Sequence, residues 1–200
     1  MNSVRGFTLI ELLVVITIIA IISSIGMVMY QQGQKGAKDT RRKQDLRSIQ
    51  AALSIYYQKN DRYPCSDNTN SGVGSSNGWQ TSTSDSWIDD KGSSCSSQLT
   101  TTAFNTSYIN LLPKDPQNTS GLPWAASSNY TYSYWSGTVT GSGCPSGVAQ
   151  YYILAAKLEN SQDPETSGNK TYNFCNGQNI TSVIPGGPDT GKLFLVTSQD

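Results

Sequence analysis

Glu11 is the first acidic residue of the chain, and it lies near the start of an apolar run that continues to about Tyr30. A carboxylate inside a membrane helix costs roughly 2.5–3.5 kcal/mol on insertion scales, so such a residue usually has a function and a partner. The small residue Gly6 precedes the run, and a cut after it would leave Phe7 as the new N-terminus. The nearest cation would then be an α-amino group, either of the same chain or of a neighbouring copy. These residues therefore predict an ion pair between a carboxylate and an amine.

The apolar run that carries Glu11 is long enough to cross a membrane. No residue from Leu12 to Tyr30 is charged, and roughly 20 residues rising ~1.5 Å each span the ~30 Å hydrocarbon core. An ordinary secretory signal has its small-residue cleavage site after the apolar region, whereas Gly6 lies before it. We therefore expect residues 1–6 to be a leader peptide and residues 7–30 to remain as a transmembrane helix.

The segment from Gly6 to Glu11, followed by an aliphatic helix, resembles the N-terminal signature of type IV pilins and type II secretion pseudopilins. The resemblance implies that a prepilin peptidase cuts after Gly6 and methylates the amine of Phe7. It also implies that Glu11 pairs with the N-terminal amine of an adjacent subunit. Copies of the chain would then be added, at an inner-membrane assembly platform, to a helical filament whose core is formed by residues 7–30.

Residues 31–62 are expected to continue the helix as an amphipathic stem. The helix should end near Asn60, because Pro64 disfavours the helical conformation at Tyr63. No proline interrupts the membrane segment, so Gly26 is the expected soft point if the helix melts on assembly. Apolar residues recur in the stem at spacings of three and four, which places them on one face: Leu46, Ile49, Leu53, and Tyr56 or Tyr57.

Residues 63–200 are expected to form an extracytoplasmic head with a long polar insert at 66–107. The segment Leu112–Pro116 resembles the Leu-Pro-x-Asp-Pro turn of major pseudopilins, and its two prolines predict a rigid corner. Alternating or apolar runs predict three late strands, at residues 130–135, 151–158 and 193–197. The expected fold class is α+β, with a long N-terminal helix packed on a small C-terminal antiparallel sheet.

Four cysteines fall in the head, and none forms a CxxC pair. An even number of cysteines beyond a membrane helix predicts disulfides in an oxidising compartment. Three pairings are possible. We favour Cys65–Cys95 and Cys144–Cys175, because each bond would staple one polar loop locally.

The charges cancel overall but are distributed unevenly. Residues 34–62 carry a net charge of +5 and residues 63–200 a net charge of −5. A positive stem and a negative head suit packing between copies, in which complementary charge fixes the register. The basic residues at 35–47 would lie in the cytoplasm under the positive-inside rule. The cysteines and the pilin resemblance favour the opposite topology, so we expect the head outside a single-pass membrane precursor, and later in a pilus or pseudopilus at the cell surface or in the periplasm.

The chain has no histidine, nucleophile elbow or phosphate loop, so we expect no enzymatic activity and no cofactor. Major pseudopilins hold Ca²⁺ in an acidic loop near the C-terminus. Asp163, Glu165 and Asp189 are weak candidates for such a site, because their spacing does not reproduce that loop. An alternative function is that of a DNA-uptake or adhesive pilin, in which the basic stem contacts nucleic acid or the head binds another ligand. A plain membrane-anchored domain would leave Gly6 and Glu11 unexplained.

Overall fold

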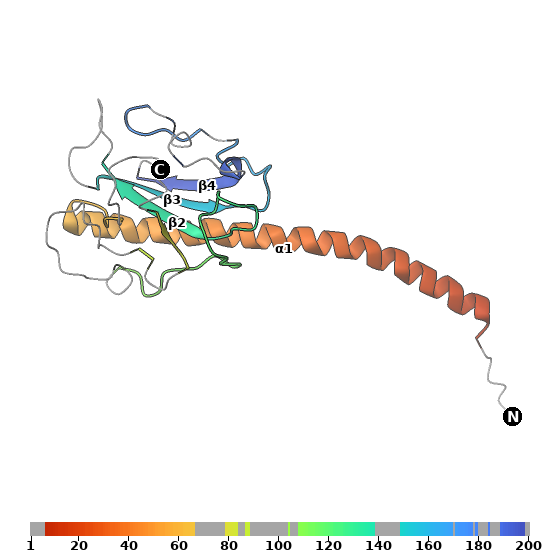
Figure 1. Ribbon diagram of the computed structural model, residues 1–200. Helices are drawn as coiled ribbons and strands as arrows, with labels where there is room; N and C mark the ends of the chain where they lie inside the picture. The colour runs from red at the N-terminus through yellow and green to blue at the C-terminus, as the bar shows by residue number, and fades with distance from the viewer. Residues whose placement is uncertain are drawn as a thin grey trace. The chain divides into compact units, whose positions relative to one another are not determined.

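The computed structural model describes residues 7–66, 79–83, 87, 88, 104, 108–138, 149–169, 171–177, 179, 184 and 189–198. One helix, α1 (Leu9–Asn60), precedes all the strands. The strands are β1 (Gln80–Thr81), β2 (Tyr132–Gly137), β3 (Tyr151–Lys157) and β4 (Leu193–Thr197), and the 3₁₀ helix η2 (Thr190–Lys192) leads into β4. The prediction of a long N-terminal helix and a small antiparallel sheet is confirmed (Figure 1).

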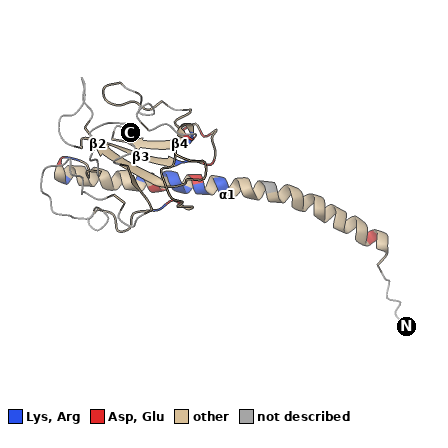
Figure 2. Ribbon diagram, in the orientation of Figure 1, with Lys and Arg blue, Asp and Glu red and all other residues tan. Residues whose placement is uncertain are grey.

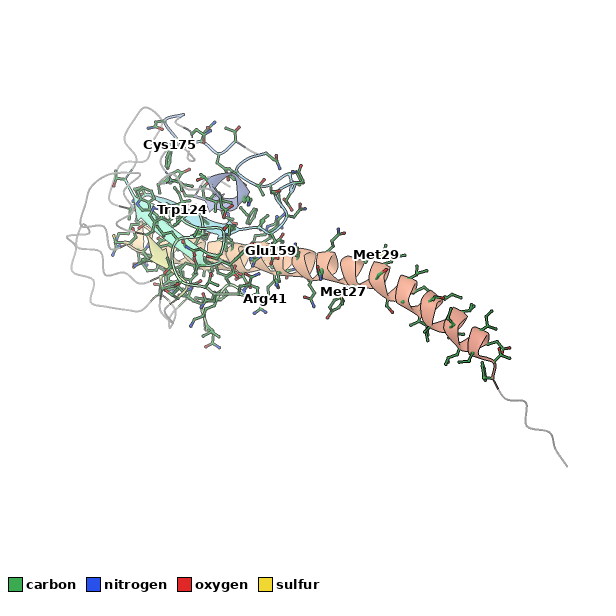
Figure 3. All side chains as sticks on the ribbon, turned by 45° about the vertical axis from the view of Figure 1, so that its right-hand side comes forward. Met27, Met29, Arg41, Trp124, Glu159 and Cys175 are labelled. Atoms are coloured by element: carbon green, nitrogen blue, oxygen red, sulfur yellow. The ribbon has the colours of Figure 1, made fainter. Side chains whose placement is uncertain are left out.

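The chain divides into two compact units, Met1–Lys38 and Asp39–Asp200, and the division falls inside α1. In the first unit the large apolar side chains of α1 are exposed on every side of the helix. Met27 and Met29, for example, project from the ribbon and are 67% and 68% exposed (Figure 3). By length and composition, α1 is able to cross a membrane.

The four strands form one antiparallel sheet in the order β1-β2-β3-β4. The register sets Tyr134 opposite Leu154, and Leu154 opposite Val196. β2 begins two residues later than the sequence predicted, and the two-residue strand β1 was not predicted at all. Every residue of β3 is buried, so the sheet is covered on both faces.

The two faces of the sheet belong to two separate hydrophobic clusters. Side chains alternate between the faces of a strand, so Tyr152 and Leu154 of β3 lie in different clusters from Tyr151 and Ile153. The first cluster contains the predicted apolar face of the stem, which packs against the sheet (Figure 1): Leu46, Ile49, Leu53 and Tyr56.

The second cluster fills the opposite face of the sheet with side chains from loops. Trp124, Tyr172, Phe174 and Ile184 are buried there against the odd-numbered residues of β3. The alternating pattern at 130–135 predicted a half-buried strand, whereas β2 is buried along all but its last residue because these loops cover it. The aromatic residues of β2 are therefore core residues and not an exposed stacking platform.

The described part of the polar insert contributes to the first cluster. Trp87 and Phe104 are buried in it, and Trp87 Nε1 donates a hydrogen bond to the carbonyl oxygen of Pro113 at 3.2 Å. The ring of Phe104 lies 5.8 Å from that of Tyr56 on α1. The insert is thus anchored on both the stem and the proline-rich corner.

Candidate functional site

Thr8 and Glu11 close a capping box at the start of α1. The backbone N–H of Thr8 donates to Oε2 of Glu11 at 2.9 Å, and the Thr8 hydroxyl donates to the same oxygen at 2.7 Å. In return, the backbone N–H of Glu11 donates to Oγ1 of Thr8 at 3.3 Å. This reciprocal pairing satisfies backbone donors that the first turn of a helix otherwise leaves unpaired. The Thr-x-x-Glu spacing of Thr8 and Glu11 is the sequence signal of this cap, whereas the sequence analysis predicted only an ion pair for Glu11.

The capping box uses only one of the two carboxylate oxygens of Glu11. Among the described residues, Oε1 has no hydrogen-bond partner. The neighbouring side chains of Phe7 and Leu9 are 83% and 88% exposed, so they do not enclose the carboxylate. Negative charge is also favourable in the first turn of a helix because of the helix dipole. The arrangement holds the carboxylate in place and leaves Oε1 able to accept a hydrogen bond from another molecule.

A second polar site lies within the unit Asp39–Asp200, which is called the head from here on, and centres on Arg42, which is completely buried. Its guanidinium binds Asp115 through two hydrogen bonds, from Nε at 2.7 Å and from Nη2 at 3.1 Å. Nη1 donates to Asp39 at 2.8 Å and to Glu159 at 3.3 Å. Burial alone would lower the pKa of Arg42, but the hydrogen bonds and charges of Asp115 and Asp39 outweigh it and raise the pKa. Arg42 is therefore a permanent cation among three carboxylates.

The carboxylates around Arg42 also hold two loops to α1. Asp39 accepts the backbone N–H groups of Glu159 and Asn160, each at 2.9 Å. Asp115 accepts the backbone N–H of Gln117 at 2.8 Å, and the side chain of Gln117 donates to Glu159 at 2.8 Å. The predicted rigid corner at Pro113–Pro116 is thus bound to the stem through its Asp.

A third polar site joins the stem to the loop after β3. Lys43 Nζ contacts Asp163 Oδ1 and Oδ2 at 2.8 and 2.7 Å and Glu165 Oε2 at 2.6 Å, while Arg47 reaches Glu165 Oε1 at 3.4 Å. Partial burial would lower the pKa of Lys43 and raise that of Asp163. The hydrogen bonds and charges of Asp163 and Glu165 outweigh burial and raise the pKa of Lys43. The hydrogen bonds from Lys43 and from the backbone N–H of Glu165, with the charge of Lys43, lower the pKa of Asp163.

The remaining acidic candidate, Asp189, lies just before η2 and binds two further lysines. Lys192 Nζ lies 2.6 Å from its Oδ1, and Lys157 Nζ lies 3.3 Å from its Oδ2. Lys157 is buried in β3 and also donates to the carbonyl oxygens of Ala126 and Ser127, at 2.8 and 3.0 Å. Burial lowers the pKa of Lys157 despite the contact with Asp189.

These ion pairs change one expectation drawn from the charge distribution. The positive stem and the negative head were expected to attract each other between copies. Instead, Arg42, Lys43 and Arg47 meet acidic residues of the same chain. Figure 2 shows Lys and Arg segments in blue along the second half of α1, with Asp and Glu segments in red near them. The basic and acidic residues do pair with each other, but at these three positions they pair within one chain.

Residues 1–27 match a family model described as the prokaryotic N-terminal methylation motif. The match covers Gly6, the capping box and most of the apolar run. The chain carries the prepilin signature of type IV pilins and pseudopilins. Comparisons with curated proteins and with solved structures find no match for it.

The site residues predicted for this chain fall partly outside the described residues. Gly6, the residue before the expected cut, lies outside the described residues, whereas Phe7 and Glu11 are described. Cys65 and Cys175 are disulfide-bonded, and the described residues contain no free cysteine. Cys95 and Cys144, the partners that we favour, lie outside the described part of the chain, so the connectivity stays a prediction.

Proposed function

We propose that the chain is a structural subunit of a type IV pilus or of a type II secretion pseudopilus. The prepilin is cut after Gly6, methylated on the amine of Phe7, and added to a filament through the first half of α1. The observation that carries this proposal is the start of α1, where the family motif coincides with an apolar helix exposed on every side and a capped carboxylate.

The proposed assembly contact is an ion pair between Glu11 and the Phe7 amine of a neighbouring copy. An isolated carboxylate is costly in the hydrocarbon region, and a cationic partner offsets that cost. Thr8 keeps Oε2 engaged, so Oε1 is the oxygen that accepts the incoming amine. The exposed apolar side chains from Leu9 to Tyr30 are then transferred from lipid to contacts between helices.

The head is proposed to be extracytoplasmic, in an oxidising compartment where disulfides form. The pairing Cys65–Cys95 and Cys144–Cys175 belongs to the same proposal. The corner at Pro113–Pro116 favours the pseudopilin branch, whereas the long polar insert and the cysteines favour a surface pilus. A DNA-uptake pilin is the second candidate, but Arg42, Lys43 and Arg47 pair within the chain, which leaves less of the basic stem for phosphate contacts.

The first test is the intact mass of the full chain after coexpression with an active prepilin peptidase. We expect a mass that starts at Phe7, with one added methyl group and four hydrogens fewer than the reduced protein. Retention of the segment from Met1 to Gly6 would contradict the proposal.

The second test is the Glu11→Ala variant, which should still insert into membranes and be processed but should yield sharply fewer filaments than the wild type. Thr8→Val is the matched control, because it removes the capping hydroxyl and keeps the carboxylate. Its filament yield should fall less than that of Glu11→Ala. Normal filaments from Glu11→Ala would exclude the assembly role of the carboxylate.

A further inference from the structure

Three acidic residues of the C-terminal half, Asp163, Glu165 and Asp189, are each engaged by at least one lysine of the same chain. Asp163 and Glu165 share Lys43, and Asp189 lies between Lys157 and Lys192. These three acids are the ones whose residue types suggested a calcium site. The described residues contain no group of three or more His, Cys, Asp or Glu side chains placed to hold a metal ion. With their lysines in place, these carboxylates do not offer Ca²⁺ the six to eight oxygen ligands that it takes.

The ammonium of Lys43 has a complete set of acceptors in the loop after β3. A lysine has three N–H donors, and Nζ lies 2.6–2.8 Å from three carboxylate oxygens of Asp163 and Glu165. The ammonium is only partly accessible, since the Lys43 side chain is 18% exposed. Its position is the point on which both carboxylates converge, so a divalent cation bound to these oxygens would have to displace it.

The rest of the loop is built around Asp163. Its Oδ1 also accepts the backbone N–H of Glu165 at 2.9 Å, and its carbonyl oxygen accepts hydrogen bonds from the side chains of Thr166 and Asn169. Thr166 in turn forms a β-bridge with Phe194 of β4. The ion pair with Lys43 thus fixes a loop that is joined to the edge of the sheet.

We propose that the ammonium of Lys43 neutralises the acidic loop at residues 159–169. It occupies the position that a bound divalent metal ion would take and replaces the charge of such an ion. Without a cation, the carboxylates of Asp163 and Glu165 would repel each other at close range. With Lys43 in place, the loop is neutralised by a side chain of α1 and the head needs no divalent ion. Asp189 repeats the arrangement with Lys157 and Lys192. The proposal does not depend on filament assembly.

The test is the melting temperature of the full chain in detergent micelles, followed by near-UV circular dichroism with millimolar CaCl₂ or with EDTA. We expect the wild-type melting temperature to be the same in both. Lys43→Met should melt at a lower temperature, and CaCl₂ should recover part of that loss by taking the vacated position. Lys35→Met is the matched control, because it removes an exposed lysine of the same helix, and it should melt like the wild type in both solutions.

Two outcomes would overturn the proposal. A wild-type chain that melts higher in CaCl₂, or lower in EDTA, would show that a metal ion already stabilises the head. If Lys43→Met melts at a lower temperature than the wild type and CaCl₂ does not raise that temperature, the ammonium and a divalent ion do not compete for one position. The wild-type measurement needs no variant, so the proposal can still be refuted if Lys43→Met does not fold.

Discussion

The two halves of α1 are one continuous helix, yet they are stabilised in different ways. In the first half, the side chain of Leu13 is 58% exposed, and its large apolar neighbours are also exposed on every side of the helix. In the second half, Leu53 is completely buried against the sheet and Arg42 is held by three carboxylates. A helix that is apolar all round needs lipid or other helices around it, whereas an amphipathic helix finds its partner in its own domain.

The difference shows that secondary structure alone does not locate a stable unit. The first half depends on surroundings that are not part of the chain. Its internal side-chain hydrogen bonds include the Thr8–Glu11 cap and the bonds that Thr17 and Ser24 donate to backbone carbonyl oxygens of the preceding turn. In the second half, the partners of Arg42 and Lys43 and the core around Leu53 lie within residues 39–200. Changes in the second half should therefore act on the stability of the head, and changes in the first half on membrane insertion or assembly.

Removing the guanidinium of Arg42 should have the largest effect on the head. Arg42→Met leaves Asp39, Asp115 and Glu159 without their shared cation, and loss of one partner from a buried ion pair typically costs about 3–5 kcal/mol. Urea unfolding, followed by tryptophan fluorescence, measures the free energy of unfolding. Arg41→Met is the control, because its side chain is 65% exposed and its pair with Asp45 should contribute at most about 1 kcal/mol. Similar losses in the two variants would refute a special role for Arg42.

A matched pair of leucine truncations compares the two halves directly. Leu53→Ala should lower the free energy of unfolding of the head by about 2–5 kcal/mol, because it leaves a cavity between α1 and the sheet. Leu13→Ala removes the same atoms from an exposed position and should change that free energy by less than about 0.5 kcal/mol. The same urea titration measures both. An effect of Leu13→Ala as large as that of Leu53→Ala would mean that the first half also stabilises the head.

Acid should weaken the head through the loop at residues 159–169, with a smaller effect. The folded pKa of Asp163 lies below its unfolded value of about 3.9. Its contribution to stability is therefore complete above that pH and is lost as the pH falls through the folded pKa. Asp45 acts in the opposite direction, because burial raises its pKa.

The measurement for Asp163 is the free energy of unfolding from about pH 5 down to about pH 2. Asp163→Asn should make the pH dependence shallower by at most about 1.4 kcal/mol per pH unit, the linkage value for one proton. An unchanged slope would mean that Asp163 does not contribute to the acid sensitivity.

The sequence predicted the parts of the molecule that depend on local pattern. The periodicity of Leu46, Ile49 and Leu53 placed the stem face, and Pro64 placed the end of α1 at Asn60. The Arg42 site was missed because its partners, Asp115 and Glu159, lie 73 and 117 residues away, and no local pattern connects such positions. The loop layer over the second face of the sheet was missed for the same reason, since Trp124 and Phe174 lie in irregular segments.

The boundary between Lys38 and Asp39 has a practical consequence for exchanging parts between this chain and other proteins that carry the same N-terminal motif. A head excised after Asn60 would lose one wall of its core and the Asp39 carboxylate that anchors Glu159 and Asn160. A membrane half from another protein should instead be spliced upstream of Asp39. Gly33 and Gly36 lie on that side of the boundary, and a Cβ added at either would meet no neighbouring atom within 4 Å. We therefore expect this short stretch to be a suitable point at which to join two helices.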